Sequence, residues 1–142
     1  MRLLSYSFAI LLGLFFSVAG SRATTTVVFP SFELNRFGSE ELVKLDDFAG
    51  SIVILDFFAY WCVPCRKVSS DLEEYVQKFY TAKGGNAAGF PVQVVSMNIE
   101  QGRAAKTRQY IKQTGVNLVL DDVGGKVYQS LNGRGIPYVV VL

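Results

Sequence analysis

The chain of 142 residues contains no histidine and only two cysteines. The missing histidine excludes histidine metal ligands and histidine-assisted nucleophiles. An excess of charge of one sign is also lacking, because 14 basic and 12 acidic side chains give a formal net charge of +2. Nucleic-acid binding proteins usually present a strongly basic face, so this balance gives no argument for a nucleic-acid partner. The length and the absence of internal repeats indicate a single folded domain.

The long apolar run of the chain lies at its N-terminus. Arg2 precedes an apolar stretch at residues 3–19, and small-x-small triplets follow at Ser17-Val18-Ala19 and Ser21-Arg22-Ala23. A membrane span needs about 20 apolar residues, and a secretory signal needs fewer. We therefore expect residues 1–20 to be a signal peptide or a retained membrane anchor that tethers the chain, 21–28 a linker, and 29–142 one domain. Both alternatives predict a periplasmic or otherwise extracytoplasmic location.

The rest of the chain alternates strand-like and helix-like patterns. A short strand is expected at 41–45, and a helical turn closed by glycine at 46–50. Residues 51–58, SIVILDFF, are apolar and β-branched, as in a strand that is buried on both faces. A helix is expected to begin near Cys62. Its predicted buried face comprises Val68, Leu72, Tyr75, Val76 and Phe79.

Further strands are expected at 90–99, 116–120 and 138–142, and further helical segments at 103–113 and 126–131. The predicted buried side of the helix at 103–113 comprises Ala104, Ala105, Tyr110 and Ile111. Strands that alternate with helices are typical of an α/β sheet built from crossover connections.

Cys62 and Cys65 are separated by two residues, and three uses of this pair are open. As a structural disulfide the pair closes a very short loop, so the chain-entropy stabilisation is small. As a zinc site it supplies two of the four ligands that tetrahedral zinc needs. As a reactive pair it needs a thiolate near neutral pH, and a helix N-terminus favours that ionised form.

The position of the pair suits the third use. The cysteines lie between the predicted buried strand and the predicted amphipathic helix. Pro64 would lie in the first helical turn, where its missing N–H costs no hydrogen bond within the helix. Cys62 would then lie near unpaired N–H groups, and Cys65 would stand one turn behind it. Tyr60 and Trp61 would form an apolar rim. Arg66 and Lys67 are expected to be solvated at the surface.

Asp56 lies inside the predicted buried strand, six residues before Cys62. In one interpretation it is a satisfied carboxylate at a strand edge, since buried acids are rare without a partner. In the other it is a buried general base whose pKa is raised by desolvation. Such a base could take the proton of Cys65 when that thiol attacks.

The segment SIVILDFFAYWCVPCRKV, residues 51–68, resembles the active-site segment of thioredoxin-fold proteins. The segment RGIPYVVVL, residues 134–142, resembles the cis-proline strand of the same family. The apolar start, the lead-in FELNRFGSEELVKLDDFAG and the WCVPC motif are similar to the TlpA/ResA-like branch. Tryparedoxin-like and nucleoredoxin-like proteins carry a comparable WCxPC site.

The resemblance implies a mixed central sheet flanked by helices, and roles for individual residues. Cys62 corresponds to the exposed nucleophile, Cys65 to the resolving thiol and Asp56 to the buried acid. Pro137 corresponds to the cis-proline, with Ile136 offering backbone hydrogen bonds to an extended substrate. The substrate-binding residues are expected to be Trp61, Pro64, Ile136 and Pro137.

The family adds a strand and a helix after the cis-proline strand, so the domain is expected to appear truncated at Leu142. The implied function is an extracytoplasmic thiol–disulfide oxidoreductase without metal or other cofactor. It would reduce protein disulfides with electrons from an upstream thiol donor, as the branch does in cytochrome c maturation. A non-catalytic binding module with a structural disulfide is the alternative. A peroxidase is disfavoured, because the usual Thr-containing loop with a lone cysteine is not seen.

Overall fold

The computed structural model describes residues 29–142, which is the predicted folded domain. The predicted signal peptide or anchor at 1–20 and the linker at 21–28 lie outside the described residues. Within residues 29–142, no helix combines the length and the apolar character that crossing a membrane requires.

A four-stranded sheet with the order β5-β4-β3-β6 forms the centre of the molecule. Strands β3 (Ile52–Phe58), β4 (Val92–Asn98) and β5 (Val119–Asp121) are parallel, and β6 (Tyr138–Val141) runs antiparallel to β3. Parallel neighbours need long crossover connections, and helices supply them here. The predicted mixed sheet flanked by helices is therefore confirmed, with β3 in its interior.

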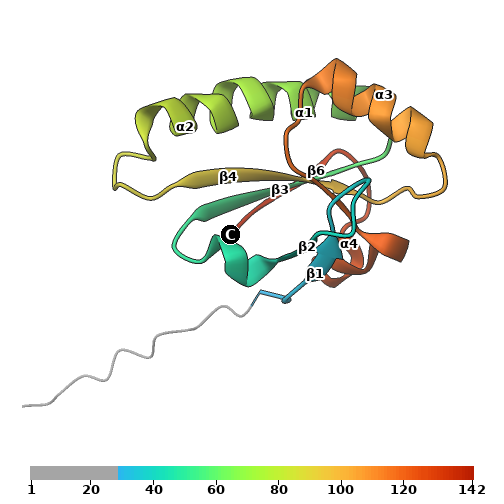
Figure 1. Cartoon of the computed structure of the whole chain (residues 1–142), viewed down its shortest axis with the longest axis horizontal. Coiled ribbons are helices and arrows are strands. Elements are labelled where there is room, and N and C mark those ends of the chain that lie inside the picture. Colours follow the sequence, from blue (N-terminus) through green and yellow to red (C-terminus); the bar gives the residue numbers. More distant parts are fainter. Residues whose placement is uncertain (1–28) are drawn as a thin grey trace, which may run out of the picture.

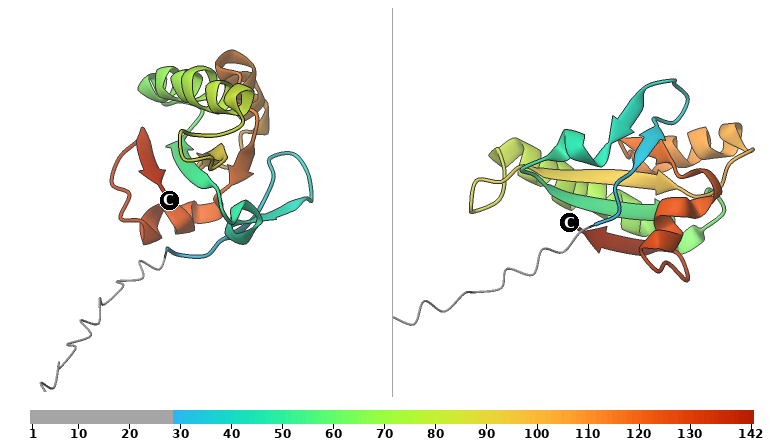
Figure 2. Two further views of the ribbon diagram at one scale, coloured as in Figure 1. Left: turned by 90° about the vertical axis from the view of Figure 1, so that its left-hand side faces the viewer. Right: turned by 90° about the horizontal axis from the view of Figure 1, so that it is seen from below.

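One face of the sheet is covered by two helical rods (Figures 1 and 2). The first is continuous and comprises α1 (Val63–Leu72), the π-helical segment η2 (Glu73–Lys78) and α2 (Phe79–Lys83). The second is α3 (Ala104–Thr114), which packs against α1.

The other face carries shorter elements. A hairpin of β1 (Glu33–Asn35) and β2 (Leu42–Lys44) leads into the helical turn η1 (Leu45–Phe48). The segments η3 (Val123–Gly125) and α4 (Lys126–Ser130) lie on the same side (Figure 2). The sequence patterns predicted β2, η1 and α4, but they missed β1.

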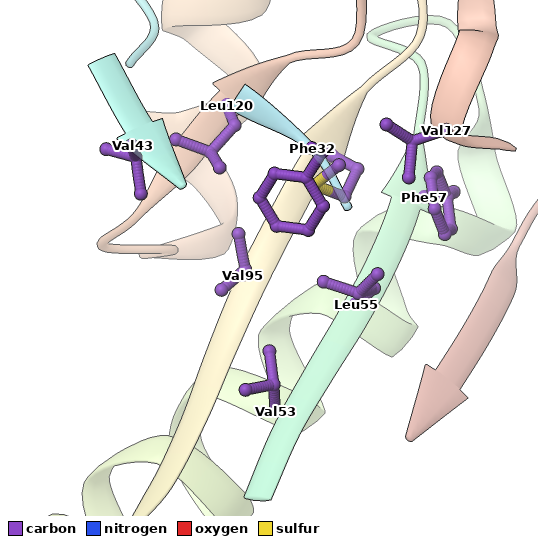
Figure 3. Close-up of a cluster of buried hydrophobic side chains, with 9 residues drawn as sticks. Phe32, Val43, Val53, Leu55, Phe57, Val95, Leu120 and Val127 are labelled. Carbon is purple, nitrogen blue, oxygen red and sulfur yellow. The ribbon is translucent and has the colours of Figure 1, made fainter. Parts of the chain in front are cut away.

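Side chains of β3 alternate between the two faces, as the pleat requires. Val53, Leu55 and Phe57 belong to a cluster that packs beneath the hairpin and α4, together with residues of β4, β5 and α4 (Figure 3). The intervening residue Ile54 belongs to a second cluster, against which Leu72 of α1 packs. Asp56 shares the parity of Ile54, so it lies on the helix-covered side of the sheet.

The buried face predicted for the first helical rod is partly wrong. Tyr75 is 70% exposed and Phe79 is 45% exposed, whereas Ser69 and Glu73 are buried. Each buried polar residue has a specific partner: Ser69 contacts Asp56, and Glu73 accepts a hydrogen bond from the backbone N–H of Asn117 at 3.3 Å. These partners stabilise polar groups on the inner face of the rod.

The prediction for α3 is also partly wrong. Ala104 and Ala105 are exposed, and Ile111 is only half-buried. The inner side of α3 comprises Thr107, Tyr110 and Thr114 instead. Their spacings of three and four residues are those of one helical face, and Tyr110 is the one predicted residue of α3 that is fully buried.

Candidate active site

Cys62 and Cys65 form a disulfide at the start of α1, with their Cα atoms 5.3 Å apart. Cys62 is the residue that caps the helix, in an extended conformation, and Pro64 stands in the first turn. The backbone N–H of Cys65 donates a hydrogen bond of 3.3 Å to Sγ of Cys62. The sulfur of Cys62 therefore lies at the positive end of the helix dipole, which favours negative charge on that atom when the disulfide opens.

Both cysteines are buried in the disulfide form. Cys62 is 4% exposed and Cys65 is fully buried, so the expected exposed position of Cys62 is wrong for the oxidised protein. Its sulfur is turned toward the first helical turn, and the surface here is formed by Trp61, which is 55% exposed, and by Val63. Pro64 is exposed beside them. The apolar rim predicted around the cysteines is present at Trp61.

A pocket of about 290 Å³ lies between Trp61 and α3. Two cationic side chains face it, Arg66 and Lys106, and no acidic residue lines it. Its other residues are aromatic or amide side chains: Tyr60, Trp61, Gln109, Tyr110 and Gln113. The pocket therefore offers stacking surfaces, hydrogen-bond donors and positive charge next to the disulfide.

The two basic residues after Cys65 differ from each other. Lys67 is solvated and pairs with Asp71 at 2.7 Å, as expected for a surface residue. Arg66 is half-buried, so the expectation of surface solvation is wrong for it. Its Nη2 donates to the carbonyl oxygen of Tyr60 at 3.2 Å, and its Nε is buried without a hydrogen-bond partner among residues 29–142. The contact with Tyr60 holds the guanidinium at the pocket wall.

The loop before β6 packs against the buried cluster that contains the cysteines. The Ile136–Pro137 peptide bond is cis, which confirms the geometry that the resemblance implied. Ile136 packs against the cluster that contains both cysteines and Phe58, whereas Pro137 is exposed. The structure thus brings together two sequence motifs that lie about 70 residues apart.

Asp56 is fully buried in the middle of β3, between β4 and β6. The interpretation as a carboxylate at a strand edge is therefore wrong. Burial raises the pKa of Asp56 from 3.8 to about 6, although a hydrogen bond from Ser69 acts in the opposite direction. The predicted effect of desolvation is confirmed. Ser69 follows Cys65 by one helical turn, so its contact places Asp56 beneath α1, one turn beyond Cys65.

Sequence reasoning missed the polar partners of Asp56. The Ser69 hydroxyl lies 2.5 Å from Oδ2 of Asp56 and 2.7 Å from the Tyr110 hydroxyl. The Tyr110 ring stacks on Phe58 at 4.3 Å. Burial and the neighbouring Asp56 charge raise the pKa of Tyr110, so its hydroxyl keeps its proton. The spacing of four residues from Cys65 to Ser69 was the available signal, since it puts both on one helical face.

The arrangement suits cysteine chemistry. Within residues 29–142, no cluster of three or more Cys, Asp or Glu side chains that could hold a metal ion is present. The site instead combines a disulfide at a helix N-terminus, a buried carboxyl group and an adjacent pocket. These groups allow exchange of the disulfide with a dithiol, together with movement of one proton.

Known proteins share this sequence in part. NHL repeat-containing protein 2 of Bos taurus is 31% identical over 116 residues, which cover 77% of this chain and 15% of that protein. The thiol-disulfide oxidoreductase ResA of Bacillus thuringiensis is 27% identical over 96 residues, which cover 67% of this chain and 50% of that protein. The chain thus spans half or less of these relatives.

Solved structures share the architecture. A structure from Chlorobium tepidum, assigned as the thiol:disulfide interchange protein DsbE, superposes with a TM-score of 0.65 and 30% identity, over 80% of this chain and 73% of that one. The sequence profile of the AhpC/TSA family matches residues 26–139, which is most of the chain. The chain has a thioredoxin fold and belongs to the AhpC/TSA family.

Proposed function

We propose that this protein is an extracytoplasmic thiol–disulfide oxidoreductase that reduces protein disulfides through Cys62 and Cys65. The observation that carries the proposal is the hydrogen bond from the Cys65 N–H to the Cys62 sulfur at the start of α1. A purely structural bond gains little from closing so short a loop. A sulfur held at a helix N-terminus suits a thiolate that leaves and attacks repeatedly.

The reaction begins with the reduced pair. The Cys62 thiolate attacks one sulfur of a substrate disulfide, and the other substrate sulfur leaves as a thiolate. Asp56 then takes the proton of the Cys65 thiol, and the Cys65 sulfur attacks Cys62 in the mixed disulfide. The Cys62–Cys65 bond forms, the second substrate sulfur leaves, and two electrons have passed to the substrate. An upstream dithiol donor then reduces the Cys62–Cys65 bond.

Substrate contacts fall on the surface around the disulfide. Trp61 and Pro64 are exposed next to the cysteines in sequence, and Ile136 packs against the cluster that contains both cysteines. The backbone of Ile136 is the proposed hydrogen-bonding partner of an extended substrate segment. Arg66 and Lys106 face the adjacent pocket without an acidic neighbour in its lining, which favours substrates with an acidic residue near the disulfide.

Three observations support the proposed direction and location of the reaction. The similarity to ResA and to the DsbE structure supports a role among extracytoplasmic oxidoreductases, and the apolar run at 3–19 fits such a location. Val63 and Pro64 between the cysteines carry no charge that would mark a strong oxidant. A role of the reductase in cytochrome c maturation is part of the proposal.

Insulin-disulfide reduction with dithiothreitol as electron donor tests the proposal. Cys62→Ser should abolish turnover, because the attacking sulfur is lost. Cys65→Ser should also lose turnover but accumulate a mixed disulfide between Cys62 and the substrate, visible by non-reducing gel electrophoresis. Full activity of Cys62→Ser would overturn the proposal. Binding of substrate without turnover, with a disulfide that never opens, would favour the alternative of a non-catalytic binding module.

A further inference from the structure

Three buried polar groups from three elements form one continuous hydrogen-bonded chain. Asp56 comes from β3, Ser69 from α1 and Tyr110 from α3, and all are 0–1% exposed. Ser69 Oγ lies 2.5 Å from Asp56 Oδ2 and 2.7 Å from the Tyr110 hydroxyl. The other carboxylate oxygen, Oδ1, is buried without a hydrogen-bond partner among the described residues. The two oxygens of one carboxyl group therefore have different surroundings.

The directions of the hydrogen bonds follow from the number of protons. A serine hydroxyl has one proton to donate, and an ionised carboxylate can only accept. Ser69 therefore donates to Asp56 Oδ2, and its oxygen accepts the proton of the Tyr110 hydroxyl. The chain runs in one direction, from Tyr110 through Ser69 to Asp56.

We propose that Ser69 and Tyr110 are positioning residues that hold Asp56 by Oδ2 and leave Oδ1 as the atom that receives the proton of the Cys65 thiol. This inference rests on the proposed function, in which Asp56 is the base. In the step, the S–H bond of Cys65 breaks and an O–H bond forms at Oδ1. The electron pair stays on sulfur, which attacks Cys62.

The alternative acceptor, Oδ2, is disfavoured by the same geometry. A proton on Oδ2 would have to be donated to Ser69, which would turn its own proton toward Tyr110. Protonation of Oδ2 would therefore break the hydrogen bonds that Ser69 and Tyr110 already make. Protonation of Oδ1 leaves both hydroxyls where they are, because Oδ2 still accepts from Ser69 and no donor among the described residues occupies Oδ1. The chain thus directs the proton to one oxygen.

Few other groups act on this carboxyl. The strand neighbours of Asp56 in register are Ser96 of β4 and Val139 of β6, neither of them charged. From the helices, Arg66 of α1 acts electrostatically on Tyr110, and Tyr110 itself keeps its proton. Besides the two cysteines once reduced, the hydroxyl chain is therefore the main polar influence on Asp56. The Ser69 bond lowers a pKa that burial raises to about 6.

Two substitutions remove one hydroxyl each and keep the packing nearly unchanged. Ser69→Ala removes the donor to Oδ2. Tyr110→Phe removes the far end of the chain and retains the ring that stacks on Phe58. Thr114→Val is the matched control, because Thr114 is also buried on α3 but its hydroxyl donates to the Tyr110 carbonyl, at 2.9 Å, outside the chain.

The pKa of Asp56 in the full chain is measured by carboxyl ¹³C NMR, with Asp56→Asn used to identify the signal. Ser69→Ala should raise this pKa by about one pH unit, since a hydrogen bond to a charged group is lost. Tyr110→Phe should raise it less, because it weakens the Ser69 donor without removing it. Thr114→Val should leave it unchanged. Equal shifts in all three variants, or no shift in the first two, would overturn the proposal.

The assignment of the proton to Oδ1 has its own spectroscopic signature. In the protonated acid, Oδ2 would be the carbonyl oxygen that accepts from Ser69, which lowers its infrared stretching frequency. Ser69→Ala should raise that frequency, and Thr114→Val should not. An unchanged band in Ser69→Ala would contradict the assignment, whatever the enzyme activity.

A kinetic measurement separates this inference from the proposed function. The pH at which Cys65 resolves a preformed mixed disulfide at half its maximal rate should move upward with the Asp56 pKa in Ser69→Ala and Tyr110→Phe. A shifted pKa with an unmoved rate profile would overturn the role of the chain in the reaction. Loss of exchange in Cys62→Ser would still support the proposed function in that case.

Discussion

The burial of Asp56 suits its proposed role as a base but lowers the stability of the fold when the carboxyl group is charged. Its carboxyl group is buried in the interior strand β3, and its pKa is raised to about 6 by desolvation. An acid that is harder to ionise in the folded state than in the unfolded state weakens the fold when it is charged. The same property makes it a proton acceptor with a pKa near the working pH of a base.

This linkage predicts a pH dependence of stability. Between pH 3.8 and about 6 the carboxyl group of Asp56 is mostly protonated in the folded protein and mostly ionised in the unfolded chain. The contribution of the Asp56 carboxyl group to the free energy of unfolding is therefore fully present below pH 3.8 and is lost as the pH rises through about 6. The lost stability is about 3 kcal/mol at most, from the size of the pKa shift.

Urea unfolding of the oxidised protein at pH values from 4 to 8 measures this loss of stability. The free energy of unfolding of Asp56→Asn, relative to that of the unsubstituted chain, should increase by up to that amount as the pH rises from 4 to 7. Asp71→Asn, a surface control on α1, should show no such increase. A constant difference between Asp56→Asn and the unsubstituted chain would contradict the raised pKa.

At the residue scale, the sequence pattern predicted the position of the cysteines at a helix start and the burial of Asp56, and the family resemblance implied the cis peptide bond before Pro137. The sequence did not reveal Ser69 and Tyr110 as partners of Asp56. The spacing from Cys65 puts Ser69 on the same face of α1, but no local pattern encodes how α1 and α3 pack against β3. It also placed Cys62 at the surface, whereas in the disulfide its sulfur turns toward the helix start. These are properties of three-dimensional contacts, which spacing alone does not contain.

At the element scale, the first helical rod shows how far periodicity reaches. The predicted helix is present, but Tyr75 and Phe79 are exposed, although the apolar pattern predicted that both would be buried. The rod contains the π-helical segment η2, and a turn of π-helix rotates the residues that follow it. Polar partners inside the molecule also stabilise Ser69 and Glu73 on the inner face. A prediction from hydrophobic periodicity counts only apolar residues, so it could not identify these two as buried.

The same rod also stabilises the sheet by a side chain. Oε1 of Gln77 accepts a hydrogen bond of 2.6 Å from the backbone N–H of Val94 in β4. The short strand β5 pairs with β4 only from Ser96 onward, so the Val94 N–H has no strand partner on that side. Gln77 thus closes a gap in the hydrogen bonding of the sheet.

Gln77→Ala should lower the free energy of unfolding by about 1–2 kcal/mol, because a half-buried backbone N–H loses its acceptor. Thr81→Ala is the matched control: it removes the exposed partner of Gln77 on the same rod, at 3.0 Å, and should cost much less. Urea unfolding monitored by circular dichroism distinguishes them. Equal stability of the two variants would show that the Val94 contact contributes nothing.

At the scale of the whole molecule, the surface charge is nearly balanced, yet it is not evenly distributed. Arg66 and Lys106 share one pocket beside the disulfide, and no acidic residue lines that pocket. None of the ion pairs among residues 29–142 involves either of them. A local positive field of this kind raises the rate at which an oppositely charged partner arrives.

Charge reversal at the pocket tests whether its two cations attract acidic substrates. Lys106→Glu should lower kcat/KM for a disulfide peptide with glutamates beside the disulfide several-fold, and the effect should shrink in high salt as charges are screened. Lys112→Glu makes the same change on the exposed side of α3, outside the pocket lining, and should have little effect. Equal losses in both variants would mean that only the overall charge matters.

The central claim is that the Cys62–Cys65 bond opens and closes as a redox reagent. Its reduction potential, measured on the full chain by equilibration in dithiothreitol buffers and thiol alkylation, tests this most directly. An exchanging pair should have a potential above about −300 mV, in the range of known dithiol oxidoreductases. A bond that stays closed in buffers well below that potential would identify it as structural and would contradict the proposed activity.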